Sequence, residues 1–282
     1  MKLRPRQRTT AAIFAGTIMV VSLLLVFTPA RSAEQPSALY ATLPFSPLSQ
    51  LAAFSLEASR VRVIGNMGIQ LSPALAFCPP GGVPYTITNT FDPTKAQLAT
   101  LNLGTGAATL VGSPLPPGQT LDIMGMTCSP DGTLYAIGQV DHTNPATFNS
   151  LYTVNRATGA ASVIGSTGVL DSSDPSGFWG YLMALAFAPD GKLYGVNSAS
   201  TLFTIDLLSG RATKVVDLVD SGTGNPLVGV MGLAIDSDEN FYVADFAPVS
   251  HIYTVSTTTG VATPILNTGL AYVHNIAFKT PG

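Results

Sequence analysis

One alternation of apolar and polar residues recurs five times along the chain. The copies begin at aliphatic residues, which are Leu51, Leu98, Leu151, Leu202 and Ile252. Neighbouring copies start 47 to 53 residues apart. Each alternation has the period of two that is typical of a half-buried β-strand, as in residues 151–154. A sequence that repeats with a period of this size predicts a repeat architecture.

Two further positions recur inside the copies. The thirteenth residue after each start is aliphatic, and these residues are Ile64, Val111, Ile164, Val215 and Ile265. The eighth residue is glycine in the last four copies and serine in the first; the five are Ser59, Gly106, Gly159, Gly210 and Gly260. Glycine takes the positive φ of a tight turn at little cost, so this position predicts a turn between two strands.

One full repeat reads as four strands. The apolar run at residues 183–187 predicts a first strand, and the turn at 189–191 (Pro-Asp-Gly) follows it. In such a turn proline presets φ and glycine takes the positive-φ position. Residues 193–196, 202–206 and 212–216 predict three more strands. Four antiparallel strands with turn signals every 8 to 12 residues are the pattern of a β-propeller blade.

The two ends of the chain complete a blade together. Residues 274–278 match the first strand of a repeat, but the chain stops in the turn that follows. Residues 39–42 match a second strand and lead into strands at 51–56 and 60–64. We therefore predict an all-β, five-bladed β-propeller in which the C-terminal segment is the innermost strand of a blade otherwise built by the N-terminus. The alternative is an open solenoid, which would need polar capping repeats that this sequence lacks.

Residues 231–245 resemble the NHL repeat and its relatives among strictosidine-synthase-like, YVTN and quinoprotein-like propellers. The resemblance extends over nearly all of the chain after residue 32 at the level of the repeat. It implies that the strand beginning near Met231 is innermost and that the strand beginning near Ala212 is outermost. These families include scaffolds, ligand binders, lactonases and lyases, so the resemblance implies a fold and not one function. The count of five blades departs from the six or seven that are usual in these families. The low charge of the chain is a second departure.

Residues 1–32 read as a signal peptide. Its basic start holds Lys2, Arg4, Arg6 and Arg8, and residues 11–27 form an apolar or small-residue run. Cleavage is expected after Ser32, which leaves residues 33–282 as a single propeller domain in a secreted or periplasmic protein. The alternative is an uncleaved membrane anchor, because the run lies at the lower limit of a membrane span.

The charge of the chain excludes one class of partner. The net charge is −3, and removal of the five basic residues of the leader brings it to about −8. The basic patch of a nucleic-acid-binding protein is absent, so we expect no nucleic-acid partner. We also expect no membrane partner after cleavage, and a monomer. Export permits a disulfide between Cys78 and Cys128, but two unbonded thiols remain the alternative.

The longer connections between strands are expected to share one face of the ring, which we call the longer-loop face. Loops on a rigid scaffold concentrate binding residues. The candidate ligand-binding residues on this face are Asp122, His142, Trp179, Tyr181, Tyr272 and His274. Histidine can act as an acid–base near neutral pH, and an aromatic ring can stack on a sugar or another planar ligand. The alternative is that the aromatic residues only fix the loops to the scaffold.

We expect no metal, no cofactor and no catalytic function. The residues at the ends of the innermost strands are mostly Leu71, Met124, Met183, Gly229 and Met231, which are not expected to bind a metal strongly. We therefore predict a non-catalytic protein that binds a small ligand or a protein partner on the longer-loop face, and we assign no catalytic residue. The alternative is a lactonase-like hydrolase or lyase with an acid–base histidine and an axial metal. A purely architectural envelope protein is a third possibility.

Overall fold

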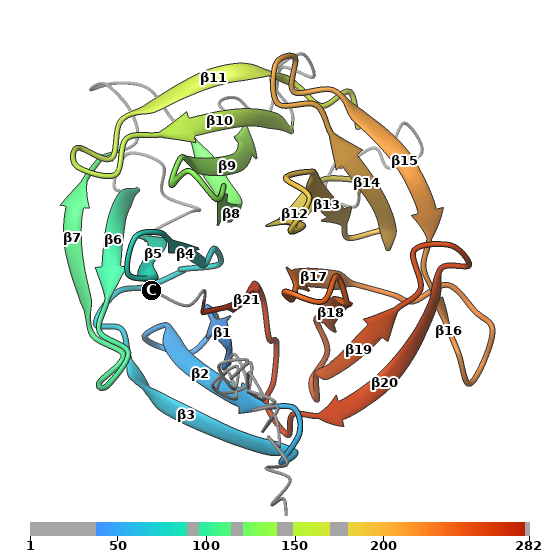
Figure 1. The fold of residues 1–282 in the computed structure, drawn as a ribbon. Helices are drawn as coiled ribbons and strands as arrows, with labels where there is room; N and C mark the ends of the chain where they lie inside the picture. The colour runs from blue at the N-terminus through green and yellow to red at the C-terminus, as the bar shows by residue number, and fades with distance from the viewer. Residues whose placement is uncertain (1–37, 89–95, 114–120, 140–148, 170–179, 280–282) are drawn as a thin grey trace, which may run out of the picture. The chain divides into compact units, whose positions relative to one another are not determined.

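A computed structural model of the chain describes residues 38–88, 96–113, 121–139, 149–169 and 180–279. These residues form five antiparallel sheets arranged in a ring around a central axis (Figure 1). The predicted all-β, five-bladed β-propeller is confirmed, and the described residues contain no helix. Accordingly, no described helix is long and apolar enough to cross a membrane.

The strands of each blade are given from the axis outward. Blade 1 contains β21 (Ile276–Phe278), β1 (Leu39–Leu43), β2 (Gln50–Ser55) and β3 (Arg60–Asn66). Blade 2 contains β4 (Ala76–Cys78), β5 (Val83–Thr88), β6 (Gln97–Leu101) and β7 (Ala108–Gly112). Blade 3 contains β8 (Asp122–Cys128), β9 (Leu134–Gln139), β10 (Ser150–Val154) and β11 (Ala161–Ser166).

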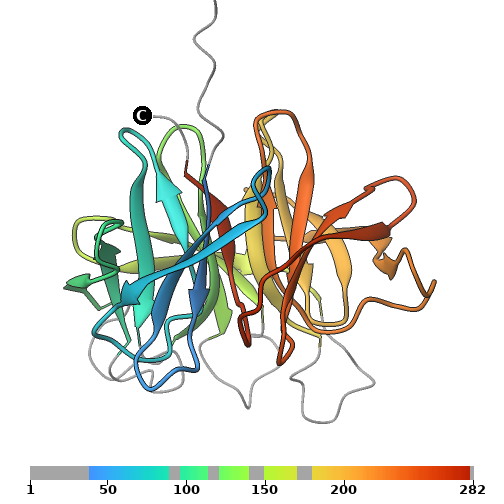
Figure 2. The same cartoon turned by 90° about the horizontal axis from the view of Figure 1, so that it is seen from below.

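Blade 4 contains β12 (Leu182–Phe187), β13 (Leu193–Asn197), β14 (Thr201–Ile205) and β15 (Ala212–Asp217). Blade 5 contains β17 (Val230–Ile235), β18 (Phe241–Asp245), β19 (His251–Val255) and β20 (Val261–Asn267). A short strand that the sequence pattern did not predict, β16 (Val219–Asp220), pairs in parallel with β20. Figure 2 shows the blades from the side of the ring.

The two ends of the chain close the ring as predicted. In blade 1, β1 pairs with β21, and Leu39 lies opposite Phe278. Beyond β21, the Thr42 amide donates to the Asn275 carbonyl at 3.1 Å, and the His274 amide donates to the Thr42 carbonyl at 3.0 Å. The regular strand starts two residues later than the predicted 274–278, yet the pairing continues through these two hydrogen bonds.

The innermost strand of blade 2 is also short, and it begins at Ala76. Proline has no amide proton to donate to a ladder, so Pro73 marks a position where regular pairing is not possible.

The recurring aliphatic residue has one structural role in all five blades. In blade 3, Leu151 lies opposite Gly165 and Tyr152 lies opposite Val163, so Ile164 is an extra residue in the outermost strand. The same register shift makes Ile64, Val111, Val215 and Ile265 the extra residues of their blades. A β-bulge of this kind increases the local twist of a strand.

The recurring glycine packs against the preceding blade. Gly106 has a φ of 82°. A Cβ atom added to it would lie 2.7 Å from the Gly65 carbonyl oxygen in blade 1, closer than real Cβ contacts allow. Ser59, the one departure from glycine, also has a positive φ of 49°. The position therefore requires a left-handed backbone. Where it contacts the preceding blade, it also leaves no room for a side chain.

Aromatic pairs join neighbouring blades near the axis. Tyrosines of second strands contact phenylalanines of the next innermost strand, and the pairs are Tyr40–Phe77, Tyr135–Phe187 and Tyr242–Phe278. Their ring centroids are 5.2 to 5.5 Å apart. Tilted and edge-to-face arrangements at this distance are favourable for aromatic rings. The core therefore lies between the blades as well as within them.

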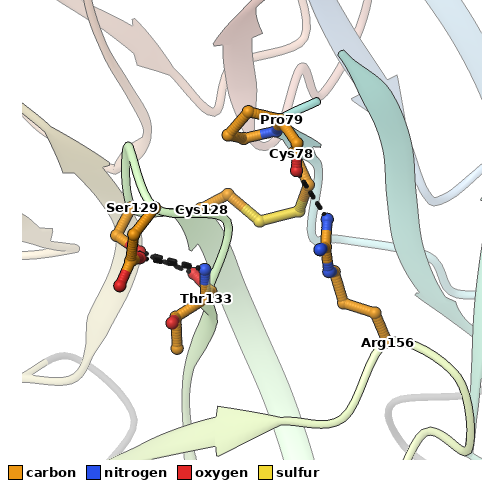
Figure 3. The surroundings of a disulfide bond; sticks show 7 residues. Cys78, Pro79, Cys128, Ser129, Thr133 and Arg156 are labelled. Carbon is orange, nitrogen blue, oxygen red and sulfur yellow. Dashed lines mark hydrogen bonds between the residues drawn. A yellow bond between two sulfur atoms is a disulfide. The ribbon is translucent and has the colours of Figure 1, made fainter. Parts of the chain in front are cut away.

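A disulfide joins blades 2 and 3, which decides between the two alternatives that the sequence left open. Cys78 ends β4, Cys128 ends β8, and their Cα atoms are 5.1 Å apart (Figure 3). Next to the disulfide, Arg156 Nη1 donates to the Pro79 carbonyl at 2.8 Å. A covalent bond and a hydrogen bond thus link the same pair of blades.

Candidate functional site

Five residues lie where the chain enters the innermost strands, and three of them share a backbone feature. The five are Leu71, Asp122, Tyr181, Gly229 and Tyr272; Asp122 is the first residue of β8, and the other four come before their strands. Three of them have a positive φ: 49° at Leu71, 71° at Gly229 and 56° at Tyr272. A left-handed conformation is uncommon for bulky residues such as leucine and tyrosine. The entry into the innermost strand is therefore built similarly in three of the five blades.

The candidate ligand-binding residues differ strongly in exposure. Asp122 and His274 are 2 % exposed and Tyr181 is 8 % exposed, whereas Tyr272 is 40 % exposed. His142 and Trp179 lie outside the described residues. Of the four candidates that are described, only Tyr272 offers its side chain to a ligand in solution.

Phe246 connects Tyr272 to further aromatic side chains. The ring centroid of Phe246 is 4.9 Å from that of Tyr272 and 5.5 Å from that of Phe45. Phe45 is 49 % exposed. The amide of Tyr272 donates to the Ala247 carbonyl at 2.8 Å, which holds the two loops together. We call these three side chains, Phe45, Phe246 and Tyr272, the aromatic patch.

Sequence reasoning missed Phe45 and Phe246, although the sequence contains a signal for both. They occupy the equivalent loops between the second and third strands of blades 1 and 5, and each is followed two residues later by a proline, Pro47 or Pro248. A comparison of these two loops with each other would have found them.

The three loops that form the aromatic patch contain no charged residue. They are residues 44–49, 246–250 and 268–275, and none contains Asp, Glu, Lys or Arg. The same loops expose Leu48 by 38 % and Val249 by 46 %. Exposed apolar groups that gather in this way mark interaction sites more often than scattered ones do.

Asp245 positions the loop that carries Phe246. One carboxylate oxygen of Asp245 accepts a hydrogen bond from the His251 amide at 2.6 Å, and the other accepts one from the Tyr253 hydroxyl at 3.1 Å. Burial, followed by the charge of Asp245, raises the pKa of Tyr253. These contacts span the base of the loop between β18 and β19, so Asp245 fixes the loop in place.

His274 lies below the aromatic patch and is uncharged. Its ring centroid is 6.0 Å from that of Phe246. Burial lowers the pKa of His274 to about 4, and a hydrogen bond with the Pro73 carbonyl has a smaller, opposite effect. The ring is therefore neutral at pH 7 and has little contact with water. A general acid–base catalyst must exchange protons with solvent, so His274 is poorly placed for that role.

A group of methionines fills the centre of the ring next to His274. Met124, Met183 and Met231 are buried and pack with Tyr181 and Phe246. Among the described residues, no group of three or more His, Cys, Asp or Glu side chains is placed to hold a metal ion. The three methionine side chains at the centre are uncharged.

Comparisons with known proteins agree on the fold. No known protein family matches the sequence. No curated protein matches it either. A structural genomics protein of unknown function from Bacteroides thetaiotaomicron has a TM-score of 0.54 at 14 % identity, and the match covers 87 % of this chain and 62 % of that chain. This chain thus spans about three fifths of that chain.

Two further solved structures are similar. One, from a nidogen/laminin complex, has a TM-score of 0.52 at 10 % identity and covers 86 % of this chain and 98 % of that chain. The other is a putative 6-phosphogluconolactonase from Bacteroides fragilis, with a TM-score of 0.48 at 13 % identity and coverage of 88 % and 99 %. At these identities, the likeness to the two structures with TM-scores above 0.5 supports the fold alone, without identifying the NHL repeat family specifically.

Proposed function

We propose that this protein is an exported, non-catalytic propeller that binds an uncharged ligand through the aromatic patch on its longer-loop face. The observation that carries the proposal is that three aromatic rings lie in contact, two of them 40 to 49 % exposed, within loops that contain no charged residue. Exposed apolar side chains that form a contiguous patch mark binding sites for ligands or proteins.

The chemistry of the patch favours a neutral ligand with a planar or apolar face. Aromatic rings stack on sugars and on other planar molecules, and the tyrosine hydroxyl adds one hydrogen-bonding group. A charged ligand would lose hydration here without meeting an opposite charge in these loops. A neutral sugar or a planar aromatic compound is therefore the preferred ligand class, with an uncharged segment of a protein partner as the alternative.

Export is supported by two independent features. The leader pattern in residues 1–32 predicts secretion or delivery to the periplasm. The Cys78–Cys128 disulfide fits an oxidising compartment outside the cytosol. The prediction that the protein is released from the membrane is part of this proposal.

Two observations favour binding over catalysis. The acid–base candidate His274 is buried and neutral, and the described residues contain no metal-binding group of acids and histidines. A lactonase-like hydrolase or lyase with an axial divalent metal is the competing function. Turnover of a lactone by the purified protein, dependent on added divalent metal and lost in His274→Ala, would favour the enzyme and contradict our proposal.

The test is a binding screen with variants of the patch. Saturation-transfer NMR with a panel of neutral oligosaccharides and planar aromatic fragments is expected to find ligands for the unchanged protein. Their signals should disappear with the double variant Phe45→Ala/Tyr272→Ala. The matched control is Leu208→Ala, which removes a 92 % exposed apolar side chain from a short turn of blade 4. Equal binding by the patch variant and the control variant, or the absence of any ligand, would contradict the proposal.

A further inference from the structure

Three innermost strands contain a methionine at the same irregular position. In β8, Ile123 lies opposite Gly138 and Gly125 lies opposite Ile137, so Met124 is an extra residue in the ladder. The same register shift makes Met183 the extra residue of β12 and Met231 the extra residue of β17. A bulge changes the direction of the side chain it contains. In three neighbouring blades, the bulge places a methionine side chain near the axis.

These three side chains converge. Met124 is 8 % exposed, Met183 is fully buried and Met231 is 5 % exposed, and they pack in one cluster. The other two methionines of the described residues, Met67 and Met126, are buried in different clusters. Chance filling of the core would not be expected to place three of five methionines at equivalent positions of successive blades.

His274 holds the equivalent position in blade 1. A Cβ atom on Gly125, next to Met124, would lie 2.7 Å from the Met183 carbonyl oxygen of the following blade. In the same way, a Cβ atom on Gly232, next to Met231, would lie 2.6 Å from the His274 carbonyl oxygen. The same backbone contact thus joins blade 3 to blade 4 and blade 5 to blade 1, with His274 in the place of Met183.

The Nδ1 atom of His274 is an unpartnered polar atom at this place. The side chain is 2 % exposed, and its Nδ1 atom has no hydrogen-bond partner among the described residues. Its ring meets Phe246, which also packs against the methionine cluster. Methionine alone is a common filler of irregular cores. Filling does not explain a buried imidazole nitrogen without a partner, because such a group costs free energy unless it is bound.

We propose that Met124, Met183, Met231 and His274 form a binding site for one soft monovalent metal ion, Cu(I) or Ag(I). Thioether sulfur is a donor that selects Cu(I), and neutral imidazole also binds copper. All four donors are uncharged, so they suit a singly charged ion better than Ca²⁺ or Mg²⁺, which prefer carboxylate and carbonyl oxygens. The site is independent of the proposed ligand on the aromatic patch, and it departs from the expectation of no metal that we drew from the sequence.

The surroundings agree with this donor set. Tyr181 and Phe246 pack against the methionines on the side of the longer-loop face and limit the access of water. Blade 2 contributes Pro73 at this position, which has no side-chain donor. The two cysteines are bonded to each other, so no thiol in the described residues competes for a soft ion.

The experiment uses Ag(I), because it needs no reductant. Silver nitrate is titrated into the purified protein in chloride-free buffer and followed by native mass spectrometry and calorimetry. We expect one bound ion per chain. With ¹³C-methyl methionine, NMR shifts are expected at Met124, Met183 and Met231 and not at Met67 or Met126.

The variants separate donor loss from structural damage. Methionine-to-leucine changes conserve volume and usually cost little stability. Each of Met124→Leu, Met183→Leu and Met231→Leu should weaken Ag(I) binding by more than the roughly tenfold that loss of an outer-shell partner costs. The matched control is Met126→Leu, because Met126 lies two residues from Met124 in the same strand. This variant should bind Ag(I) as tightly as the unchanged protein does.

The first three outcomes that would overturn the proposal concern the silver ion and the methionines. They are the absence of a bound silver ion, equal affinity in the triple methionine variant and the unchanged protein, and methyl shifts at Met67 or Met126 in place of the axial three. Binding that is lost in His251→Ala but kept in the triple variant would assign the ion to the partly exposed His251 and would also overturn it.

Discussion

The short turns and the longer loops of this propeller differ in how their polar groups are used. In the short turns, acidic side chains bind groups within the same turn: Asp190 accepts from the Lys192 amide at 3.0 Å, and Asp206 accepts from the Ser209 amide at 2.8 Å. Hydrogen bonds to Lys192 and to Ser209 are also the main reason that the pKa values of these two carboxyl groups are lowered. The three loops of the aromatic patch contain no charged residue.

This difference separates scaffold from site. A turn whose carboxylate already accepts hydrogen bonds from its own amides has little capacity left for a ligand. The longer-loop face instead exposes aromatic rings and covers an axis where the Nδ1 atom of His274 and both side-chain polar atoms of Asn275 have no hydrogen-bond partner among the described residues. We therefore expect changes in the short turns to alter stability, and changes in the aromatic patch to alter binding alone.

The largest effect is expected from the disulfide, at the short turns of blades 2 and 3. The Cys78→Ala/Cys128→Ala variant releases a loop that spans 50 residues. Loss of the closed loop from the unfolded chain should lower the free energy of unfolding by about 4 kcal/mol. Urea denaturation of the variant and of the unchanged protein, without reductant, measures the difference. A loss below about 1 kcal/mol would show that the disulfide does not stabilise this part of the scaffold.

Acid is expected to destabilise the axis through His274. The folded pKa is about 4 and the unfolded value is 6.5, so below pH 6.5 the unfolded chain binds a proton that the folded chain does not. The contribution of His274 to the free energy of unfolding is therefore constant above pH 6.5 and falls as the pH drops. At pH 4 the free energy of unfolding should be lower by about 3 kcal/mol. Denaturation curves between pH 7 and pH 4 should show this loss.

The control for the acid effect is His274→Gln, which removes the titrating group and keeps a polar side chain. The difference between the two proteins isolates the contribution of His274 from that of the carboxylates. Parallel stability curves for the two proteins would contradict a buried, neutral His274.

The contact between blades should be visible in two glycines that share a backbone conformation. Gly210 has a φ of 76° and packs against the backbone of Gly165, whereas Gly191 has a φ of 83° and has no neighbour within 4 Å of the Cβ position. Alanine at Gly191 costs only the left-handed strain, while alanine at Gly210 adds overpacking, so Gly210→Ala should be the less stable by about 2 kcal/mol. Equal losses in thermal or urea unfolding would mean that the blades yield at this contact.

Most of the fold could be predicted because each repeat obeys the same local physics. The recurring glycine was visible as a turn, and the match of residues 39–42 to a second strand was enough to place the C-terminal segment beside them. The role of Ile164 and its equivalents as bulge residues could not be predicted, because an extra residue in a strand has no signature beyond being aliphatic. The short β16 was missed for a similar reason, since two residues carry no periodicity.

The site could be predicted less well because exposure depends on packing between blades. Asp122, Tyr181 and Tyr272 lie at or just before the start of equivalent strands, yet only Tyr272 is exposed. Sequence position placed them on one face but gave no information on which side chains turn inward. The sequence gives no reason to group the methionines of the axis, because their packing in one cluster is visible only in three dimensions.

The smallest effect on stability is expected from the aromatic patch, and it sharpens the comparison most. Phe45→Ala/Tyr272→Ala removes two exposed side chains but keeps the hydrogen bond from the residue 272 amide to the Ala247 carbonyl. Exposed substitutions of this kind usually change the free energy of unfolding by about 0.5 kcal/mol or less each. The variant should therefore unfold almost as the unchanged protein does, in contrast to Gly210→Ala. A loss of more than about 2 kcal/mol would show that these rings hold the loops to the scaffold, which is the alternative role for aromatic residues on this face.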